Sequence, residues 1–314
     1  MKKIIVDKNS EIKTIQKALL LIDNNDKNEI FIKSGVYYEK VKIVGNHIKL
    51  IGEDLNNTII SYNDYAKKNH ADGKEMNTFR TYTCMVVGNF IEIENLTIEN
   101  TSGDGIIYGQ AVALSTLGDM INIKNCRILA NQDTLFLGPL PRDLIVRYHN
   151  FLPFDELVYP INHRVIVRKT IIQGDVDFIF GGANAYFEDC TFISLLRDGY
   201  VFAPSTEEDE EYGFTINHSY FKGLSEVPNT YIARPWRDYG KVVVINSVYE
   251  AHIKDEGFDK WNDSSRDKTC RFYEYNNMYI DNHAYSRIYF SKVLKQEELE
   301  KYELKNLLFE KSKV

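Results

Sequence analysis

Two aspartates stand in segments that otherwise have the pattern of buried β-strands. Asp133 lies in ANQDTLFLG (130–138), and Asp177 lies in QGDVDFIFGG (173–182). An ionised carboxylate without a partner is costly in such surroundings. If the two lie together, one is expected to be protonated and the other charged. Such a pair is suited to acid–base and nucleophilic chemistry.

Polar groups elsewhere in the chain could complete a site around these aspartates. Gln132 directly precedes Asp133, and Gln110 begins the apolar segment QAVAL. Primary amides can stabilise an oxyanion without adding charge. Arg234 in YIARPWRDYG could hold one carboxylate ionised through paired N–H donors, and the flat ring of Trp236 suits a sugar face. Singly, each glutamine is more often a turn residue and Trp236 more often core, so the hypothesis depends on the combination.

Six ten-residue segments share one pattern, with apolar third and eighth positions in nearly all of them and a polar fifth position. Their fifth residues are Asn95, Asn125, Lys169, Asp189, His218 and Asn246. Such self-similarity, with variable loops between the strands, predicts an all-β solenoid of stacked coils. A β-sandwich with repeated alternating strands is the alternative fold.

The repeat also predicts where the two aspartates lie. Asp133 follows Asn125 by eight residues, and Asp177 follows Lys169 by the same interval. Equal phase in successive coils would stack the two side chains about 4.8 Å apart. Polar ladders in structural solenoids are usually made of neutral amides, so a stack of two aspartates favours a functional site.

The ends of the chain are predicted to be helical. We expect an N-terminal helix at about 10–24 that Ser10 caps, and a C-terminal amphipathic helix at about 291–310. Residues 1–314 are expected to form a single catalytic domain. The phase of the repeats separates Cys126 from Cys190 by one coil, so we expect free thiols.

Composition limits the classes of function. Apolar residues make up 44% of the chain, charged residues 26%, and the net charge is −7, which argues against nucleic-acid or anionic-membrane partners. The N-terminal segment MKKIIVDKNS lacks the apolar stretch of a secretory signal. We therefore expect a cytoplasmic protein, or a secreted one if a leader was removed. No serine-hydrolase elbow, P-loop or metal-binding motif is present in the sequence.

Five segments resemble the pectin methylesterases (pectinesterases) in order and approximate spacing. They are GVYYE (35–39), QAVAL (110–114), QDTL (132–135), DFIFG (177–181) and IARPW (232–236). The resemblance covers nearly the whole chain. It implies a right-handed parallel β-helix, and hydrolysis of the C6 methyl ester of galacturonate in pectin or its oligomers, an activity of pectin degradation and cell wall modification.

The resemblance also implies roles for individual residues. Asp177 would be the nucleophile, Asp133 the general acid and then base, and Gln132 the oxyanion stabiliser that Gln110 assists. Arg234 would orient Asp177 and keep it charged. The implied substrate-binding residues are Trp236, Thr78, Gln110, Arg234 and Phe178. The family uses no metal or organic cofactor, and we expect methylesterified homogalacturonan or oligogalacturonides as partners of a monomer.

Two departures and two alternatives accompany this interpretation. Ala233 replaces the glycine usual before Arg-Pro-Trp, which could shift Arg234 slightly. The long connection 138–163 carries Tyr148, His149, Phe151 and Tyr159, which could overhang the groove and favour short oligomers. The alternative functions are a polyuronate-cleaving β-helix glycosidase and a carbohydrate-binding solenoid without catalysis.

Overall fold

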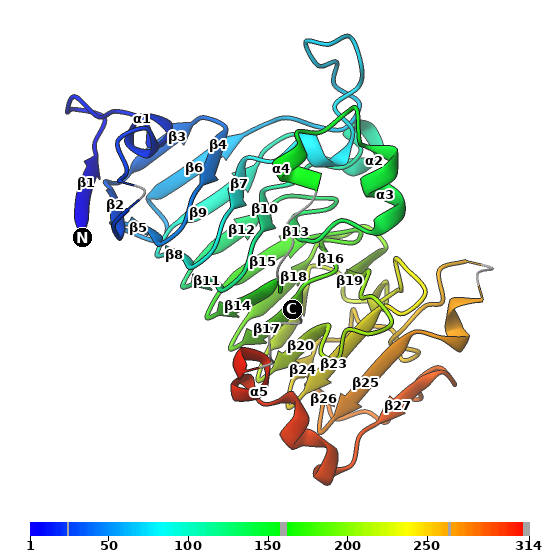
Figure 1. The fold of residues 1–314 in the computed structure, drawn as a ribbon. Coiled ribbons are helices and arrows are strands. Elements are labelled where there is room, and N and C mark those ends of the chain that lie inside the picture. Colours follow the sequence, from blue (N-terminus) through cyan, green and yellow to red (C-terminus); the bar gives the residue numbers. More distant parts are fainter. Residues whose placement is uncertain (24, 158–161, 263–264, 310–314) are drawn as a thin grey trace.

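The chain winds into a solenoid of stacked coils, as the repeats predict, and the solenoid is the right-handed parallel β-helix that the family resemblance implies. The computed structural model describes residues 1–23, 25–157, 162–262 and 265–309. Three sheets run along the length of the solenoid (Figure 1). Strands of successive coils pair in parallel, as in the pairing of β11 with β14 in sheet A, β12 with β15 in sheet B and β13 with β16 in sheet C. The all-β solenoid prediction is thus confirmed.

The three sheets have eleven, nine and seven strands. Sheet A consists of β1 (Lys2–Val6), β2 (Asn28–Ile32), β5 (Ile48–Gly52), β8 (Ile91–Glu94), β11 (Ile121–Lys124), β14 (Arg164–Arg168), β17 (Asn184–Glu188), β20 (Phe214–Asn217), β23 (Lys241–Ile245), β25 (Arg271–Tyr275) and β27 (Ser291–Val293). Sheet B consists of β3 (Gly35–Tyr38), β6 (Thr58–Tyr62), β9 (Thr97–Asn100), β12 (Arg127–Leu129), β15 (Ile171–Gly174), β18 (Thr191–Ser194), β21 (Tyr220–Gly223), β24 (Val248–Tyr249) and β26 (Met278–Tyr279). Sheet C consists of β4 (Val41–Val44), β7 (Cys84–Val87), β10 (Leu114–Leu117), β13 (Leu135–Leu137), β16 (Ile179–Gly181), β19 (Gly199–Pro204) and β22 (Thr230–Ala233).

The helices are short and lie outside the coils. They are α1 (Ile15–Leu19), α2 (Gly105–Tyr108), α3 (Arg142–Arg147), α4 (Phe154–Leu157), α5 (Leu304–Phe309) and the 3₁₀ helices η1 (Thr78–Arg80), η2 (Arg266–Lys268) and η3 (Gln296–Tyr302). Within the described ranges, no helix combines the length and apolar character needed to cross a membrane.

Both terminal helices differ from the sequence-based expectation. The N-terminal helix covers Ile15–Leu19 and is capped by Thr14, whose side chain accepts a bond from Lys17 N. The Ser10 hydroxyl instead accepts a bond from Ile12 N (3.1 Å) within a turn that precedes the helix. Glu39, from the GVYYE segment, accepts the N–H groups of Ile15 (2.8 Å) and Gln16 (3.0 Å) at the start of α1. The expected C-terminal helix is instead divided into β27, η3 and α5.

The repeated polar position marks a turn between sheets A and B. Asn95, Asn125 and Lys169 lie there with φ of 59°, 51° and 48°. Asparagine tolerates this left-handed conformation better than other residues with a side chain. The Asn125 side chain also donates to Asn95 Oδ1 across the coils (2.9 Å). The polar fifth position is therefore selected by backbone conformation and by a ladder of amides.

Sheet C has an apolar outer face that the 138–163 connection covers. Met85, Phe136 and Phe180 project from this face into an apolar cluster. Leu144 of α3 and Leu157 of α4 pack against the same cluster and are 5% and 4% exposed. The connection therefore folds because it buries apolar surface that the solenoid itself leaves uncovered.

We predict that Asn125→Ala lowers the free energy of unfolding by about 1–2 kcal/mol, because alanine disfavours a positive φ and cannot bond to Asn95. Chemical denaturation at equilibrium measures this loss. The matched control is Lys169→Asn at the next turn, which should hold or raise stability because asparagine accepts φ of 48° more readily. An Asn125→Ala protein as stable as the unmodified one would contradict this account of the turns.

Candidate active site

Seven of the eight predicted site residues line one cavity. The cavity has a volume of about 460 Å³ and opens on the outer side of sheet C. The predicted residues that line it are Thr78, Gln110, Gln132, Asp133, Asp177, Arg234 and Trp236. They come from segments more than 150 residues apart in the chain, so the stacking of coils is what brings them together.

The two aspartates occupy the same position in neighbouring coils. Strands β13 and β16 pair with Leu135 opposite Ile179, and each aspartate precedes its strand by two residues. The backbone N–H of Asp133 also donates to Val176 O (3.1 Å). Asp133 and Asp177 have φ of 61° and 51°. The phase argument from the sequence therefore places the two residues correctly.

Arg234 forms a two-pronged ion pair with Asp177. Its Nε donates to Asp177 Oδ1 (2.7 Å), and its Nη2 donates to Oδ2 (2.6 Å). The guanidinium lies between two aromatic rings, 3.8 Å from the centroid of Tyr200 and 3.9 Å from that of Trp261. Ala233 is fully buried in the core and does not prevent this geometry. Paired donors and stacked rings fix the plane of the Asp177 carboxylate.

The surroundings raise the pKa values of the two carboxyls to different extents. Burial raises the pKa of Asp133 well above its ordinary value of 3.8, and the charge of Asp177 raises it further. Burial also raises the pKa of Asp177, but the hydrogen bonds and charge of Arg234 oppose that rise. The pKa of Asp177 is still raised, but that of Asp133 is raised further, so Asp133 is the carboxyl that more readily holds a proton and Asp177 the one that more readily ionises.

Gln132 is held by a close approach of helix α2. A Cβ on Gly105 would lie 2.7 Å from Gln132 Oε1, so only glycine allows this contact. Arg197 also contacts this position and has its Nη1 4.0 Å from Asp175 Oδ2. Asp175 is 2% exposed, and its charge contributes to the raised pKa of Asp133. Three residues therefore act on the site without lining the cavity: Gly105, Asp175 and Arg197. The sequence patterns had not singled them out.

The placement of Phe178 corrects one expectation. Its side chain is fully buried in the core of the solenoid and does not line the cavity. Asp177 and Phe180, on either side of it in the motif, are the residues that face the cavity. Phe178 therefore packs the coil interior, and the predicted substrate contact at this position is wrong.

The 138–163 connection reaches the cavity through α3. Tyr148 lines the cavity, as expected of an overhanging aromatic residue. His149 and Phe151 instead line a separate cavity of about 480 Å³ with Arg80. The guanidinium of Arg80 stacks on the Phe151 ring at 3.6 Å. Tyr159 lies outside the described residues.

Several cavity residues were not predicted to belong to the site. They are Phe79, Leu144, Arg147, Phe180, Ala203, Arg237 and Trp261. Phe180 and Arg237 lie within or beside recognised motifs, whereas Trp261 and Arg147 lie in segments without any. Among the residues described, no group of three or more His, Cys, Asp or Glu side chains is arranged to hold a metal ion.

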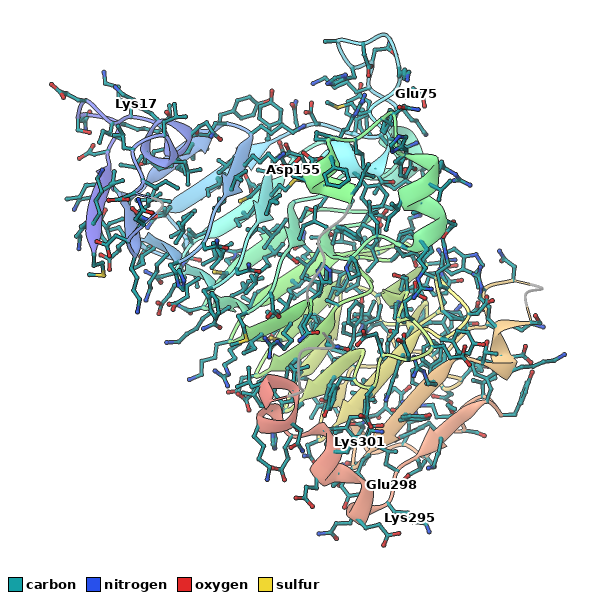
Figure 2. The ribbon with its side chains drawn as sticks, viewed as in Figure 1. Lys17, Glu75, Asp155, Lys295, Glu298 and Lys301 are labelled. Carbon is teal, nitrogen blue, oxygen red and sulfur yellow. The ribbon has the colours of Figure 1, made fainter. Side chains whose placement is uncertain are left out.

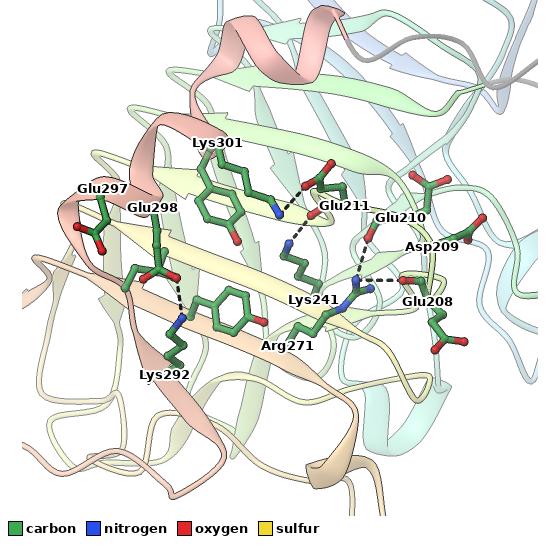
Figure 3. A pocket seen from close by; sticks show the side chains of 13 residues that line it. Glu208, Asp209, Glu210, Glu211, Lys241, Arg271, Lys292, Glu297, Glu298 and Lys301 are labelled. Atoms are coloured by element: carbon green, nitrogen blue, oxygen red, sulfur yellow. Dashed lines mark hydrogen bonds and ion pairs between the residues drawn. The ribbon is translucent and has the colours of Figure 1, made fainter.

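A larger cavity of about 630 Å³ lies near the C-terminal end, between η3 and sheet A (Figure 3). Two of its lysines are in ion pairs: Lys301 with Glu211 (2.5 Å) and Lys292 with Glu298 (2.6 Å). Lys301 and Glu298 lie well away from Asp155 of α4 in Figure 2. The residues that line this cavity include neither aspartate of the stacked pair. The Lys301–Glu211 pair joins η3 to the loop before β20.

Comparisons with known proteins point to one family. Residues 3–139 and 142–311 match the family model described as Pectinesterase. The chain is 30% identical over 311 residues to pectinesterase QRT1 of Arabidopsis thaliana, covering 95% of this chain and 75% of that protein. It is also 30% identical to the probable pectinesterase/pectinesterase inhibitor 21 of the same plant, but spans only 36% of that protein's length. The solved structure of pectin methylesterase PemA from Erwinia chrysanthemi has the same fold, with a TM-score of 0.81, 24% identity and coverage of 99% and 98% of the two chains.

We predict that Asp133→Asn raises stability at neutral pH relative to the unmodified protein. In the folded state Asp133 binds a proton more tightly than in the unfolded state, so its ionisation costs stability as pH rises above the ordinary value of 3.8. Asparagine removes that cost. Denaturation at pH 3 and pH 7 should therefore show a stability difference that grows with pH in favour of the variant.

Asp143→Asn is the matched control, because Arg237 lowers the pKa of Asp143. A carboxyl with a lowered pKa stabilises the fold at neutral pH and loses that contribution in acid. The control should therefore lose stability at pH 7 and little at pH 3, the opposite sign. A pH-independent difference for Asp133→Asn would contradict the buried, protonated state of this residue.

Proposed function

The chain belongs to the pectinesterase family and is a carboxylic ester hydrolase, and from that premise we propose that Asp177 and Asp133 hydrolyse the C6 methyl ester of galacturonate in two steps. The observation that carries the proposal is the stacked pair of aspartates in one cavity, with Arg234 bonded to only one of them. Charged Asp177 is the nucleophile, and protonated Asp133 is the acid. The products are methanol and a free galacturonate carboxylate.

In the first step, a carboxylate oxygen of Asp177 attacks the ester carbonyl carbon. The carbonyl electrons move onto oxygen, and the bond to the methoxy group breaks as the tetrahedral intermediate collapses. Asp133 gives its proton to the departing methoxide, which leaves as methanol. An acyl-enzyme anhydride between the sugar and Asp177 remains, and Asp133 is now a carboxylate.

In the second step, Asp133 acts as a base. It takes a proton from water while the water oxygen attacks the acyl carbon of the sugar. The bond to Asp177 breaks, which restores charged Asp177 and releases galacturonic acid, and that acid then gives its proton to solvent to leave the free carboxylate. Asp133 is protonated again, so the cycle is balanced. The ion pair with Arg234 also favours Asp177 as the leaving group, because it stabilises the returning negative charge.

Two amides are suited to the oxyanion that forms in each step. Gln132 and Gln110 come from adjacent coils, since Ala111 N donates to Gln132 O (3.1 Å), and both line the cavity. An amide donor stabilises the developing charge without competing for the proton of Asp133. The contact of Gly105 with the Gln132 side chain keeps this donor in place.

Trp236 and Thr78 are suited to holding the sugar. The Trp236 ring packs edge-on against Phe180, with centroids 5.6 Å apart, and stays partly exposed in the cavity. A partly exposed aromatic ring offers an apolar platform for the C–H face of a sugar. Thr78 begins η1 on the side of the cavity formed by the 63–83 loop and is 9% exposed.

We predict that Asp177→Ala lowers the rate of methanol release from methylated oligogalacturonides by at least about 10³-fold while the fold is kept, because the nucleophile is lost. Asp189→Ala is the matched control. Asp189 shares the left-handed backbone conformation (φ of 54°) but is exposed and outside the cavity. The control should keep its rate within about twofold, since surface substitutions perturb little.

Two outcomes of this assay would overturn the proposal. A folded Asp177→Ala protein that still releases methanol would refute the nucleophile assignment. If the unmodified protein generates new reducing ends without methanol, the chain is instead a glycosidase, the nearest alternative. Circular dichroism and thermal unfolding of both variants establish that the fold is intact.

The connection over sheet C also suggests a preference for short substrates. Asp143 of α3 forms two bonds to Arg237, at 2.9 and 2.8 Å, and Arg237 lies over the Trp236 ring. Helix α3 is thereby joined to the segment that carries Trp236 and Arg234. Helix α3, held in this position, would obstruct a long polymer at the cavity and leave room for an oligomer.

We predict that Asp143→Ala raises the rate on long methylated pectin, relative to a methylated trimer, by about two- to fivefold. The range follows from the roughly 0–1 kcal/mol that an exposed ion pair contributes. Asp155→Ala on α4 is the control, because Lys42 keeps its bond to Glu156 (2.7 Å). A polymer-to-trimer ratio of one in the unmodified protein would contradict the proposed length preference.

A further inference from the structure

Helix α3 presents one face to the active-site cavity. Leu144, Arg147 and Tyr148 lie three and four residues apart, and all three line the cavity. Leu144 and Tyr148 are 5% and 8% exposed, and the Tyr148 hydroxyl donates to Asn77 Oδ1 (3.0 Å). The buried side chains of Leu144 and Tyr148 hold the backbone on either side of Arg147 in place, and the side chain of Arg147 extends from there to the cavity.

Arg147 differs from the other two arginines that line the cavity. Arg234 is paired with Asp177, and Arg237 is paired with Asp143. Arg147 is exposed, and no carboxylate of the described residues lies within 4.0 Å of its guanidinium. Its position in the last turn of α3 is favourable for a cation. Arg147 also interacts with the Tyr148 hydroxyl, which opposes the rise that burial causes in the pKa of that phenol. These interactions leave several of its five N–H donors for a ligand.

The charges of the cavity therefore leave a surplus at Arg147. Arg234 is matched by Asp177 and Arg237 by Asp143, and burial favours the neutral form of Asp133 by raising its pKa. A guanidinium presents paired donors whose geometry matches a carboxylate. Pectin carries two forms of the same group, a neutral methyl ester and an anionic carboxylate. Only the second can form a charged, two-pronged contact with Arg147.

We propose that Arg147 binds a free carboxylate on a sugar next to the one whose ester is hydrolysed. The inference rests on the proposed function and specifies its substrate: an oligogalacturonate in which the reacting methyl ester has an unesterified neighbour. Arg147 is a specificity-determining residue that the 138–163 connection adds to the site. Fully esterified substrates lack its partner and bind less well.

The test uses two trigalacturonates, one fully methylated and one methylated only on its central sugar. The quantity measured is the ratio of kcat/KM for methanol release from the second to that from the first. In Arg147→Gln this ratio should fall about tenfold, mainly through KM, which corresponds to the loss of one charged contact. In Arg142→Gln the ratio should stay unchanged.

Arg142→Gln is a matched control because it removes the same charge from the same helix. The Arg142 side chain is 80% exposed and does not line the cavity. An equal fall in both variants would mean that the general field of α3 selects the substrate, and would overturn the proposal. An unchanged ratio in Arg147→Gln would also overturn it.

Binding of unesterified trigalacturonate separates this inference from the proposed function, because it needs no catalysis. The dissociation constant should rise about tenfold in Arg147→Gln and stay constant in Arg142→Gln. If the unmodified protein binds this trimer through Arg147 but releases no methanol from either ester, the proposed function fails while the binding of a free carboxylate by Arg147 stands. If methanol is released while neither readout depends on Arg147, the inference fails and the function stands.

Discussion

The site depends on a buried ion pair that only one of its two aspartates shares. Arg234 and Asp177 have side chains 15% and 12% exposed, so each would be costly to bury without the other. The rings of Tyr200 and Trp261 hold the guanidinium in the plane of the carboxylate. Because Arg234 is bonded to Asp177 alone, burial and the neighbouring negative charge outweigh the effect of Arg234 on Asp133 and raise the pKa of that carboxyl. A single arginine thereby gives two chemically identical side chains different tendencies to hold a proton.

The solenoid supplies the positions on which this arrangement depends. Each coil places its turn residues in register with those of the next coil. At some turns that register produces neutral ladders, such as the bond from Asn276 Nδ2 to Asn246 Oδ1 (2.8 Å). Before β13 and β16 the same register stacks two acids. The fold tolerates this unfavourable stack because the ion pair with Arg234 and a proton on the other carboxyl reduce the repulsion. Both aspartates also have a positive φ, and such strained residues cluster at active sites.

Much of the fold and site could be predicted because their determinants are periodic. The interval from the repeat marker fixed the phase of Asp133 and Asp177, and the family motifs supplied the polar groups around them. Phe178 was misplaced because a motif does not say which side chains point into the coil. Trp261 and Arg147 were missed because they reach the cavity from connections without a repeat. Their contribution depends on tertiary packing alone.

The ends of the chain show the same limit. The helical pattern of the C-terminal segment is real, but Ser291–Val293 adds to the edge of sheet A instead, where β27 pairs with β25. Leu294 and Tyr302 are then buried against Val243 and Ile245, which favours a strand and a 3₁₀ turn over one long helix. Tertiary burial outweighed local propensity here. At the N-terminus, the side chain of Glu39 from the next part of the chain determined where α1 begins.

The most direct test of the central claim is the protonation state of the two carboxyls in the resting protein. Carbon-13 NMR of aspartate labelled at the carboxyl carbon reports it, with Asp133→Asn and Asp177→Asn used to assign the signals. The account predicts that at neutral pH the carboxyl of residue 133 is protonated and that of residue 177 is ionised. Two ionised carboxyls, or a proton on residue 177 in place of 133, would contradict it.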